Sequence, residues 1–445
     1  MSRPQKESQL AEDLPTIDPG LRRAIIEASA ELRGENEALL ARLVRHRSTL
    51  GNEQSCLSAM EDAYRDIGLS PWRIAVEPAI LDGQRGFSPP LIPYEGREPV
   101  VALHRPRERK GRSLMLQGHV DVVPEGAADL WTSPPFEPTV RGDRMYGRGA
   151  ADMKAGLAAS ITALRALRLV GVQPAAELQM AAVIEEECTG NGALAVMLAL
   201  GKPDACLIPE PGPGYAALYT AQVGVVWAWI TVTGRPAHVR EMQSGVNAIE
   251  AANAIAAAFK SYEESMNAGE RRHPAFAASN HPINVNLGTI EGGEWNSSVP
   301  TRARIGLRVG VMPGHSCHEV ARDIERVVAE MASRPEMRGA SVRTEFRGFM
   351  ADGCIFPPDQ AISRVVAAAH REITGEDLRH YAAPGLTDGR FYVLYGQTEA
   401  TCYGPDSDSI HGIDESVGLR SLADVTAALA ITVASWCGVE SVSPG

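Results

Sequence analysis

The segment LQMAAVIEEECTGNGALAVMLALGKPDACLI, residues 178–208, contains the pattern that decides the fold. Residues 178–184 form a short apolar run typical of a buried strand, and residues 205–208 form a second one. Between them, residues 192–200 form an apolar run of helical length that follows a glycine-containing turn. A strand, a helix and a strand in this order predict one unit of a parallel α/β sheet.

The sequence on both sides repeats this alternation. Residues 113–117 (SLMLQ) predict a strand, and residues 153–170 predict a helix with its leucines on one side. A further helix is expected over residues 21–46, with Gly34 as a weak point. Helices and strands alternate again from about residue 350 to the end of the sequence. We therefore expect an α/β fold with a mainly parallel sheet.

The order of predicted strands and helices changes between residues 222 and 349. Aromatic and branched residues at 222–233 predict a strand, a long Ala-rich helix is expected over 246–261, and two strand-like runs follow. A helix over 315–333 and a strand over 341–346 complete a β-α-β-β-α-β order, which predicts an inserted ferredoxin-like α+β domain. We expect a flexible tail at 1–20, one domain built from 21–221 and 350–445, and a second domain at 222–349.

The composition excludes several classes of protein. The chain has 445 residues, 44% hydrophobic and 22% charged residues, and a net charge of −12 without a basic stripe, which argues against a nucleic-acid partner. The start has no apolar core, and the longest apolar stretches fall short of the roughly 20 residues that span a membrane, so we expect no membrane association. Seven scattered cysteines without C-x-x-C favour reduced thiols and a cytoplasmic protein.

Histidines and carboxylates follow the predicted strands at several points. Each alone has an ordinary explanation, as a loop histidine, a helix cap, a turn or a solvated charge run. The three adjacent glutamates that follow residue 184 are the least ordinary, because neighbouring carboxylates repel one another unless a cation compensates them. The candidate ligands are His119, Asp152, Glu187, Glu210 and His411.

Considered together, these five residues predict a metal site. Ligands of open α/β sheets bind beyond the carboxyl ends of the strands, which is where these five residues are expected. Two histidines and three carboxylates suit two borderline metal ions such as zinc. An additional glutamate beside them suits a general base for metal-assisted hydrolysis. Asp121 follows His119 by two residues and can accept a hydrogen bond from its second ring nitrogen.

Several motifs in order also resemble a known family. GHVDVVPEG, W-x-x-x-P-F-E-P, DRMYGRGAADMKAG, EEECTGNGA and PEPG resemble the dizinc metallopeptidases and deacylases that include acetylornithine deacetylase, succinyl-diaminopimelate desuccinylase, aminoacylase and glutamate carboxypeptidase. The match covers about 98–250 and 384–417 and is nearest to the acetylornithine deacetylase-like deacylases. It implies a zinc-exopeptidase-like catalytic domain with an inserted lid and dimerisation domain.

The resemblance implies a role for each motif residue. Two Zn²⁺ ions, for which Co²⁺ or Mn²⁺ can substitute, would be bridged by Asp152. His119 and Glu210 would complete one site, and Glu187 and His411 the other. Asp121 would orient His119. Glu186 would be the general base, chosen over its neighbours because the downstream Gly190-Asn-Gly192 aligns with the family's glycine turn. Glu185 is expected to be a strand-end carboxylate without a catalytic role.

The resemblance extends to the lid and the substrate loop. His238 resembles the lid histidine that reaches the partner's active site in dimeric members, so a homodimer through the lid is expected. Asn296, Gly385, Thr387 and Arg390 would contact or support the substrate. The family's lid arginine is replaced by Gly310, with Arg308 two positions earlier, which changes how a substrate carboxylate could be gripped.

Together these inferences predict a cytoplasmic, metal-dependent amide hydrolase that removes an acyl group from a small N-acyl amino acid or a related amine. A dipeptidase or carboxypeptidase of the same family, a deformylase or deacylase of a non-amino-acid amine, and a non-catalytic metal-binding homologue remain as alternatives.

Overall fold

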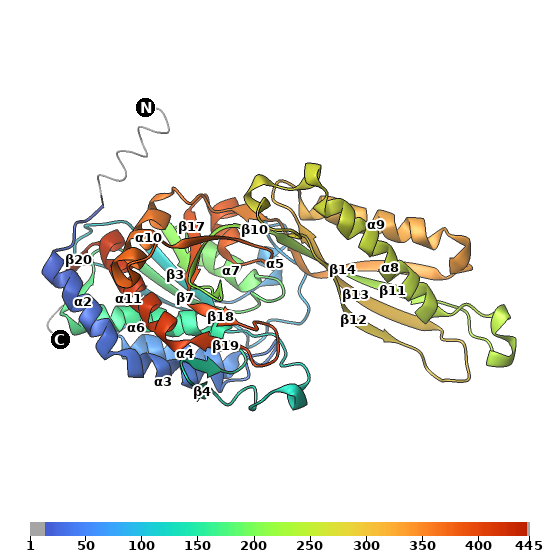
Figure 1. Ribbon diagram of the computed structural model, residues 1–445, viewed down its shortest axis with the longest axis horizontal. Helices are drawn as coiled ribbons and strands as arrows, with labels where there is room; N and C mark the ends of the chain where they lie inside the picture. The colour runs from blue at the N-terminus through green and yellow to red at the C-terminus, as the bar shows by residue number, and fades with distance from the viewer. Residues whose placement is uncertain (1–13, 443–445) are drawn as a thin grey trace.

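The computed structural model describes residues 14–442 of the chain, so residues 1–13 of the expected N-terminal tail lie outside the described residues. Two hydrophobic cores organise the described part. The larger core lies around a nine-stranded sheet, and the smaller core lies under a four-stranded sheet formed by the middle of the chain. Figure 1 shows the smaller sheet and its two helices extending from the larger body.

The large sheet has the strand order β1-β2-β7-β3-β8-β17-β10-β15, with β16 beside β10. Its strands are β1 (Trp72–Arg73), β2 (Val100–His104), β3 (Leu114–His119), β7 (Leu178–Val183), β8 (Ala205–Ile208), β10 (Ala217–Gln222), β15 (Cys354–Ile355), β16 (Arg379–Ala383) and β17 (Glu399–Gly404). The central strands β7, β3, β8 and β17 run parallel to one another. On one side β2 pairs antiparallel with β7 and with β1, and on the other side β10 pairs antiparallel with β17 and β15 and parallel with β16. The predicted α/β class is confirmed, with the parallel pairing in the centre of the sheet.

Burial explains why these strands lie in the centre. Every residue of β3, β7 and β8 is buried, so both faces of the sheet are covered. The helices of this part are α2 (Pro19–Glu31), α3 (Arg33–Val44), α4 (Gln54–Asp66), α5 (Pro78–Leu81), α6 (Ala155–Leu169), α7 (Asn191–Leu200), α10 (Ala361–Thr374) and α11 (Leu419–Cys437). The α6 and α11 helices pack against β3, and α7 packs against β7. None of the helices in residues 14–442 combines the length and apolar character that a membrane crossing needs.

One predicted helix is divided in two. The sequence predicted a single helix over 21–46, but the structure has α2 and α3 with Leu32 between them. Leu32 leaves helical geometry (φ −82°, ψ 4°), and its amide donates back to the carbonyl of Ala28, which closes the end of α2. The low helix propensity of Gly34 in the next turn makes this the weakest point of the pattern.

The middle of the chain has the predicted ferredoxin-like order. The strands β11 (Gly224–Thr233), β12 (Val285–Gly292), β13 (Arg302–Val311) and β14 (Ser341–Ala351) form an antiparallel sheet in the order β12-β13-β11-β14, and the helices are α8 (Ala248–Asn267) and α9 (Cys317–Ala332). Alternate residues of β11, including Val226, Ala228 and Ile230, are buried in the core beneath α8 and α9. The other face of this sheet carries the half-buried residues of β11.

A small third sheet is formed by strands from three segments that are distant in the sequence. It contains β4 (Thr139–Arg141), β5 (Arg144–Tyr146), β9 (Gly212–Pro213), β18 (Asp406–Asp408) and β19 (Ser416–Gly418). A two-stranded ribbon of β6 (Val172–Pro174) and β20 (Val439–Ser441) lies apart from it. All seven cysteines are buried and free.

The contact between α6 and the loop after β8 requires a glycine. A Cβ atom on Gly156 would lie 2.2 Å from the carbonyl oxygen of Pro209, whereas a Cβ on Gly34 in α3 would meet nothing within 4 Å. We predict that Gly156→Ala lowers the free energy of unfolding by about 1–3 kcal/mol because the helix must move away from the sheet. The matched control Gly34→Ala should raise it by about 0.5–1 kcal/mol. Equal effects of the two substitutions in denaturant unfolding would contradict this packing.

Candidate metal centre

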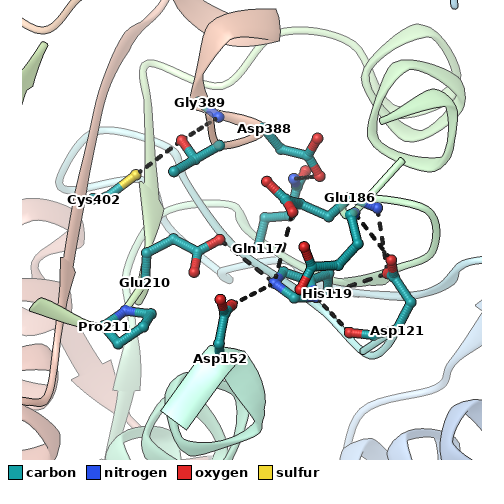
Figure 2. A network of polar contacts seen from close by, with 12 residues as sticks. Gln117, His119, Asp121, Asp152, Glu186, Glu210, Pro211, Asp388, Gly389 and Cys402 are labelled. Carbon is teal, nitrogen blue, oxygen red and sulfur yellow. Dashed lines mark hydrogen bonds and ion pairs between the residues drawn. The ribbon is translucent and has the colours of Figure 1, made fainter. Parts of the chain in front are cut away.

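The candidate ligands gather where the central parallel strands end. His119 is the last residue of β3, the three glutamates follow β7, and Glu210 follows β8 by two residues. His411 comes from the loop between β18 and β19, and Asp152 lies in the irregular turn η2 (Ala150–Lys154) that precedes α6. Figure 2 shows the side chains of Asp152, Glu186 and Glu210 directed toward the ring of His119. All five predicted ligands are therefore brought together.

Asp152 occupies the centre of this cluster. Its Oδ1 atom lies 3.1 Å from Nε2 of His119, and its Oδ2 atom lies 3.3 Å from Nε2 of His411. The two imidazoles thus face different oxygens of one carboxylate. Burial raises the pKa of Asp152, but the hydrogen bonds and charges of the two histidines outweigh it, so its pKa is held below the ordinary value.

Each histidine also faces a glutamate. Oε1 of Glu210 lies 3.7 Å from Nε2 of His119, and Oε1 of Glu187 lies 3.0 Å from Nε2 of His411. Atoms of His119, Asp152 and Glu187 lie within 4.8 Å of one another, which is a ligand arrangement that can hold a metal ion. His119 is buried, whereas His411 is about half exposed, so the cluster opens to solvent on the side of His411.

The chemistry of the cluster fits divalent cations. Burial raises the pKa values of Glu186 and Glu210 well above the ordinary range, which shows the electrostatic cost of enclosing these carboxylates without compensation. The buried Oε1 of Glu186 has no hydrogen-bond partner among residues 14–442. Imidazole nitrogens and carboxylate oxygens are donors that zinc and similar ions accept. The residues present therefore fit a metal centre.

Asp121 contacts His119 through its backbone carbonyl, whereas the sequence suggested a contact through its side chain. The Nδ1 atom of His119 lies 2.8 Å from the backbone carbonyl of Asp121, whereas the Asp121 carboxylate is 3.7 Å from that nitrogen. The carbonyl can accept only from a protonated Nδ1, which leaves Nε2 free as a ligand. The carboxylate instead accepts the amides of Glu186 and Glu187 at 3.3 and 3.1 Å. Burial raises the pKa of Asp121 to about 7.

Glu185 is separated from the cluster by its backbone conformation. It has a left-handed φ of 61°, and its buried carboxylate contacts Arg97 Nη1 at 2.7 Å and the hydroxyls of Tyr94 and Thr189 at 2.6 Å each. The next two residues, Glu186 and Glu187, instead line a cavity that Asp152 and Glu210 also line. The contacts of Glu185 are those of a structural ion pair.

The substrate residues expected from the sequence fall into two groups. Arg308, Gly385 and Thr387 line a cavity of about 710 Å³ that also contacts Asp152, Glu186 and Glu210. Arg390 is fully buried outside the cavity lining, where it donates to the carbonyls of Thr189 and Thr387. His238 and Asn296 are exposed, and the cavity lining does not include them.

Three further residues near the cluster were not singled out by the sequence. The carboxylate of Glu415 accepts the backbone amides of Gly149, Ala151 and Asp152 at 3.0–3.1 Å. Arg148 pairs with the same carboxylate at 2.5 Å. Asp388 accepts from the Gln117 amide at 3.2 Å, and burial raises its pKa to about 6. Glu415 follows His411 by four residues and Asp388 directly follows Thr387, so proximity to residues of the motifs was the available signal.

A two-part α/β chain with imidazoles and carboxylates at the carboxyl ends of its parallel strands has the architecture of a metal-dependent hydrolase. The comparisons with known proteins identify the family. The model of peptidase family M20/M25/M40 matches residues 115–435, and the chain belongs to this family. The predicted resemblance, the hydrolase class and the metal dependence are thereby confirmed.

Relatives of the chain include enzymes with different substrates. A succinyl-diaminopimelate desuccinylase from Rhizorhabdus wittichii is 31% identical over 76% of this chain and 86% of that protein. An N-formyl-4-amino-5-aminomethyl-2-methylpyrimidine deformylase from Halalkalibacterium halodurans is 25% identical over 73% of this chain and 79% of that protein. Among solved structures, human carnosine dipeptidase 1 has a TM-score of 0.75 at 14% identity, covering 95% of this chain and 100% of that chain. The latter similarity concerns the fold.

We predict that Glu415 contributes to metal affinity without touching the metal, because its carboxylate orients the turn that carries Asp152. Glu415→Gln should weaken divalent-metal binding by about 10–100-fold in a chelator competition assay. Glu440→Gln is a matched control, because Glu440 is also largely buried and accepts backbone amides, but on strand β20. Equal metal affinities in the two variants would contradict the role of Glu415.

Proposed function

We propose that the protein hydrolyses the amide bond of a small N-acyl amino acid or a related N-acyl amine and releases the acyl group. The observation that supports this most strongly is the Asp152 carboxylate, whose two oxygens face His119 and His411 separately. The named activities of two relatives, a desuccinylase and a deformylase, are both removals of an acyl group from nitrogen. A dipeptidase activity is the second candidate, since the fold is shared with dipeptidases.

The proposed metal centre contains two divalent ions, with zinc as the first choice and cobalt or manganese as substitutes. His119 and Glu210 would hold one ion, Glu187 and His411 the other, and Asp152 would contact both. When bound, such ions lower the pKa of water and polarise an amide carbonyl. The carbonyl of Asp121 holds the His119 ring in position, and the Asp121 carboxylate fixes the amides of Glu186 and Glu187.

Glu186 is the proposed general base. Its Oε2 atom lies 3.9 Å from Nε2 of His119, its Oε1 atom lacks a hydrogen-bond partner, and its side chain lines the cavity. A carboxylate that is buried, unpartnered and next to the reacting centre has a raised pKa and an oxygen available for a proton. Glu186 would take the proton of the attacking water and return it to the leaving amine.

The roles of neighbouring glutamates can be separated by experiment. We predict that Glu186→Gln retains both metal ions but lowers kcat by at least about 100-fold, because only proton transfer is removed. Glu187→Gln should instead lose metal, because a ligand is replaced. Metal content and turnover of N-acetyl amino acids measure both effects. If the Glu187 variant keeps its metal while the Glu186 variant loses it, the assignment is shifted by one residue.

We also propose that residues 222–349 form a lid and dimerisation domain inserted between 21–221 and 350–445. A separate hydrophobic core under β11–β14 supports this division, although β14 itself continues to Ala351. Within the described part of the chain, the strand β12 lies at the edge of its sheet and pairs with β13 alone, and it exposes Leu287 and Ile290. An apolar open edge favours pairing with a second copy of the chain.

The same proposal accounts for His238. This exposed residue forms an isolated backbone bridge with Ser298, close in sequence to the exposed Asn296, so both lie on one surface of the lid. Since neither lines the cavity of its own chain, we propose that they serve the site of the partner. His238 would then stabilise the developing negative charge on the amide oxygen.

Mixing two inactive variants tests this arrangement. We predict that His238→Ala and Glu186→Gln protomers, each inactive alone, recover about a quarter of wild-type activity after they are unfolded together and reassociated at equal ratio. About half of the dimers are then mixed, and one of the two sites in each mixed dimer contains both an intact Glu186 and an intact His238. Sedimentation establishes that dimers have formed. Dimers without recovered activity would contradict a contribution of His238 across the interface.

A further inference from the structure

The cavity that the carboxylate cluster lines also has an aromatic part. Trp227 and Trp229 of β11 and Phe349 of β14 line it, and we call these three residues the aromatic wall. The two indoles are two residues apart and lie on the sheet face opposite the helices, where they are half-buried and border the cavity. Large aromatic surfaces that border an open cavity beside a reactive cluster are typical of ligand sites.

Glycines make room for both indole rings. Gly306 is the cross-strand partner of Trp229, and a Cβ atom on it would lie 2.9 Å from Cζ3 of that ring. Gly348 lies in a bulge opposite Trp227, with a left-handed φ of +83°, and a Cβ there would lie 2.5 Å from Cε3. The Phe349 ring meets Trp227 edge to face with centroids 5.5 Å apart. The backbone thus fixes the rings in place.

The bulge is also attached to the larger domain. The Gly348 amide donates to the Pro89 carbonyl at 2.8 Å, and Nη2 of Arg347 donates to the Leu91 carbonyl at the same distance. The amide of Met350 donates to the Ser88 hydroxyl at 3.1 Å. These bonds hold the aromatic wall at a set position relative to the carboxylate cluster, and a preorganised wall binds ligand at lower entropic cost.

The charged side chains that line the cavity restrict which chemical groups the aromatic wall can bind. Among the lining residues in the described part of the chain, every acidic side chain belongs to the carboxylate cluster, so none is left to pair with a second amine. Arg308 is the one Arg or Lys side chain in that lining, and its guanidinium already contacts the carbonyls of Asn284 and Pro384 at 3.4 and 3.3 Å. Aromatic faces attract cations, but the Trp229 ring already carries the Arg304 guanidinium 4.6 Å from its centroid, so a second cation beside it is repelled. An uncharged, flat group therefore matches the aromatic wall better than an ammonium or a second carboxylate.

We propose that Trp227, Trp229 and Phe349 form a subsite for an aromatic group, so that the enzyme selects N-acyl compounds that carry an aromatic ring on the amine or on the acyl side. The selectivity rests on the proposed amide hydrolysis. The volume of about 710 Å³ lies in the range of small-molecule pockets, roughly 300–1,000 Å³.

Kinetics of matched substrates test the selectivity of the metal-loaded enzyme. We expect kcat/KM for N-acetyl-phenylalanine to exceed that for N-acetyl-alanine, or kcat/KM for N-phenylacetyl-glycine to exceed that for N-acetyl-glycine, by about tenfold or more. Trp227→Ala should reduce this ratio toward one, and Trp227→Phe should restore much of it. Trp72→Ala, on the exposed edge strand β1 and outside the cavity lining, is the control and should leave the ratio unchanged.

Binding of the products separates this subsite from the reaction itself, because products cannot be hydrolysed. NMR titrations compare phenylalanine with alanine, and phenylacetate with acetate, so the shared carboxylate cancels within each pair. Tighter binding of the aromatic member in either pair, lost in Trp227→Ala, supports the subsite and identifies its side, even if no amide is cleaved. Equal binding within both pairs overturns the subsite, even if N-acetyl-alanine is hydrolysed.

Discussion

The mutual repulsion of carboxylates that meet beyond the ends of β7 and β8 and in the turn before α6 is the constraint on which the rest of the structure depends. Asp152, Glu186 and Glu210 converge on the His119 ring within 4 Å. Enclosing this much negative charge is unfavourable without a cation, and a divalent ion offsets two charges at once. The parallel strands supply the convergence, because their carboxyl ends meet at one edge of the sheet.

The cluster is positioned largely by main-chain atoms. The carbonyl of Asp121 orients His119, the amides of Glu186 and Glu187 hold the Asp121 carboxylate, and Glu415 holds the turn before α6. The bonds of the Asp121 and Glu415 carboxylates join segments that are distant in the sequence, whereas the bond between His119 and the Asp121 carbonyl is local. A side chain fixed through several backbone groups has little freedom to relax, which is the condition for a preorganised site. The third sheet, in which β19 lies between β5 and β18, provides the frame for His411 and Glu415.

Much of the fold and of the cluster could be predicted from the sequence, because short apolar runs, helix periodicity and motif residues are local signals. The strands β7 and β8, the helix α7 and the ferredoxin-like order were predictable in this way. The division between α2 and α3 and the antiparallel pairing at the edges of the large sheet could not be predicted, because both depend on packing in the folded chain. The use of the Asp121 carbonyl instead of its carboxylate depends on a distance of 2.8 Å against 3.7 Å, which no sequence pattern records. The aromatic wall was missed because the bulge at Gly348 brings Phe349 to Trp227 only in the folded sheet.

One cavity is lined both by a charged cluster suited to divalent ions and by a wall of aromatic rings. The central proposal is that one carboxylate, Asp152, would contact two divalent ions. Anomalous X-ray scattering from crystals of the zinc-loaded protein tests this most directly. The account predicts two zinc peaks, one at each oxygen of Asp152, the first beside His119 and Glu210 and the second beside His411 and Glu187. A single peak, or peaks that avoid Asp152, would contradict it.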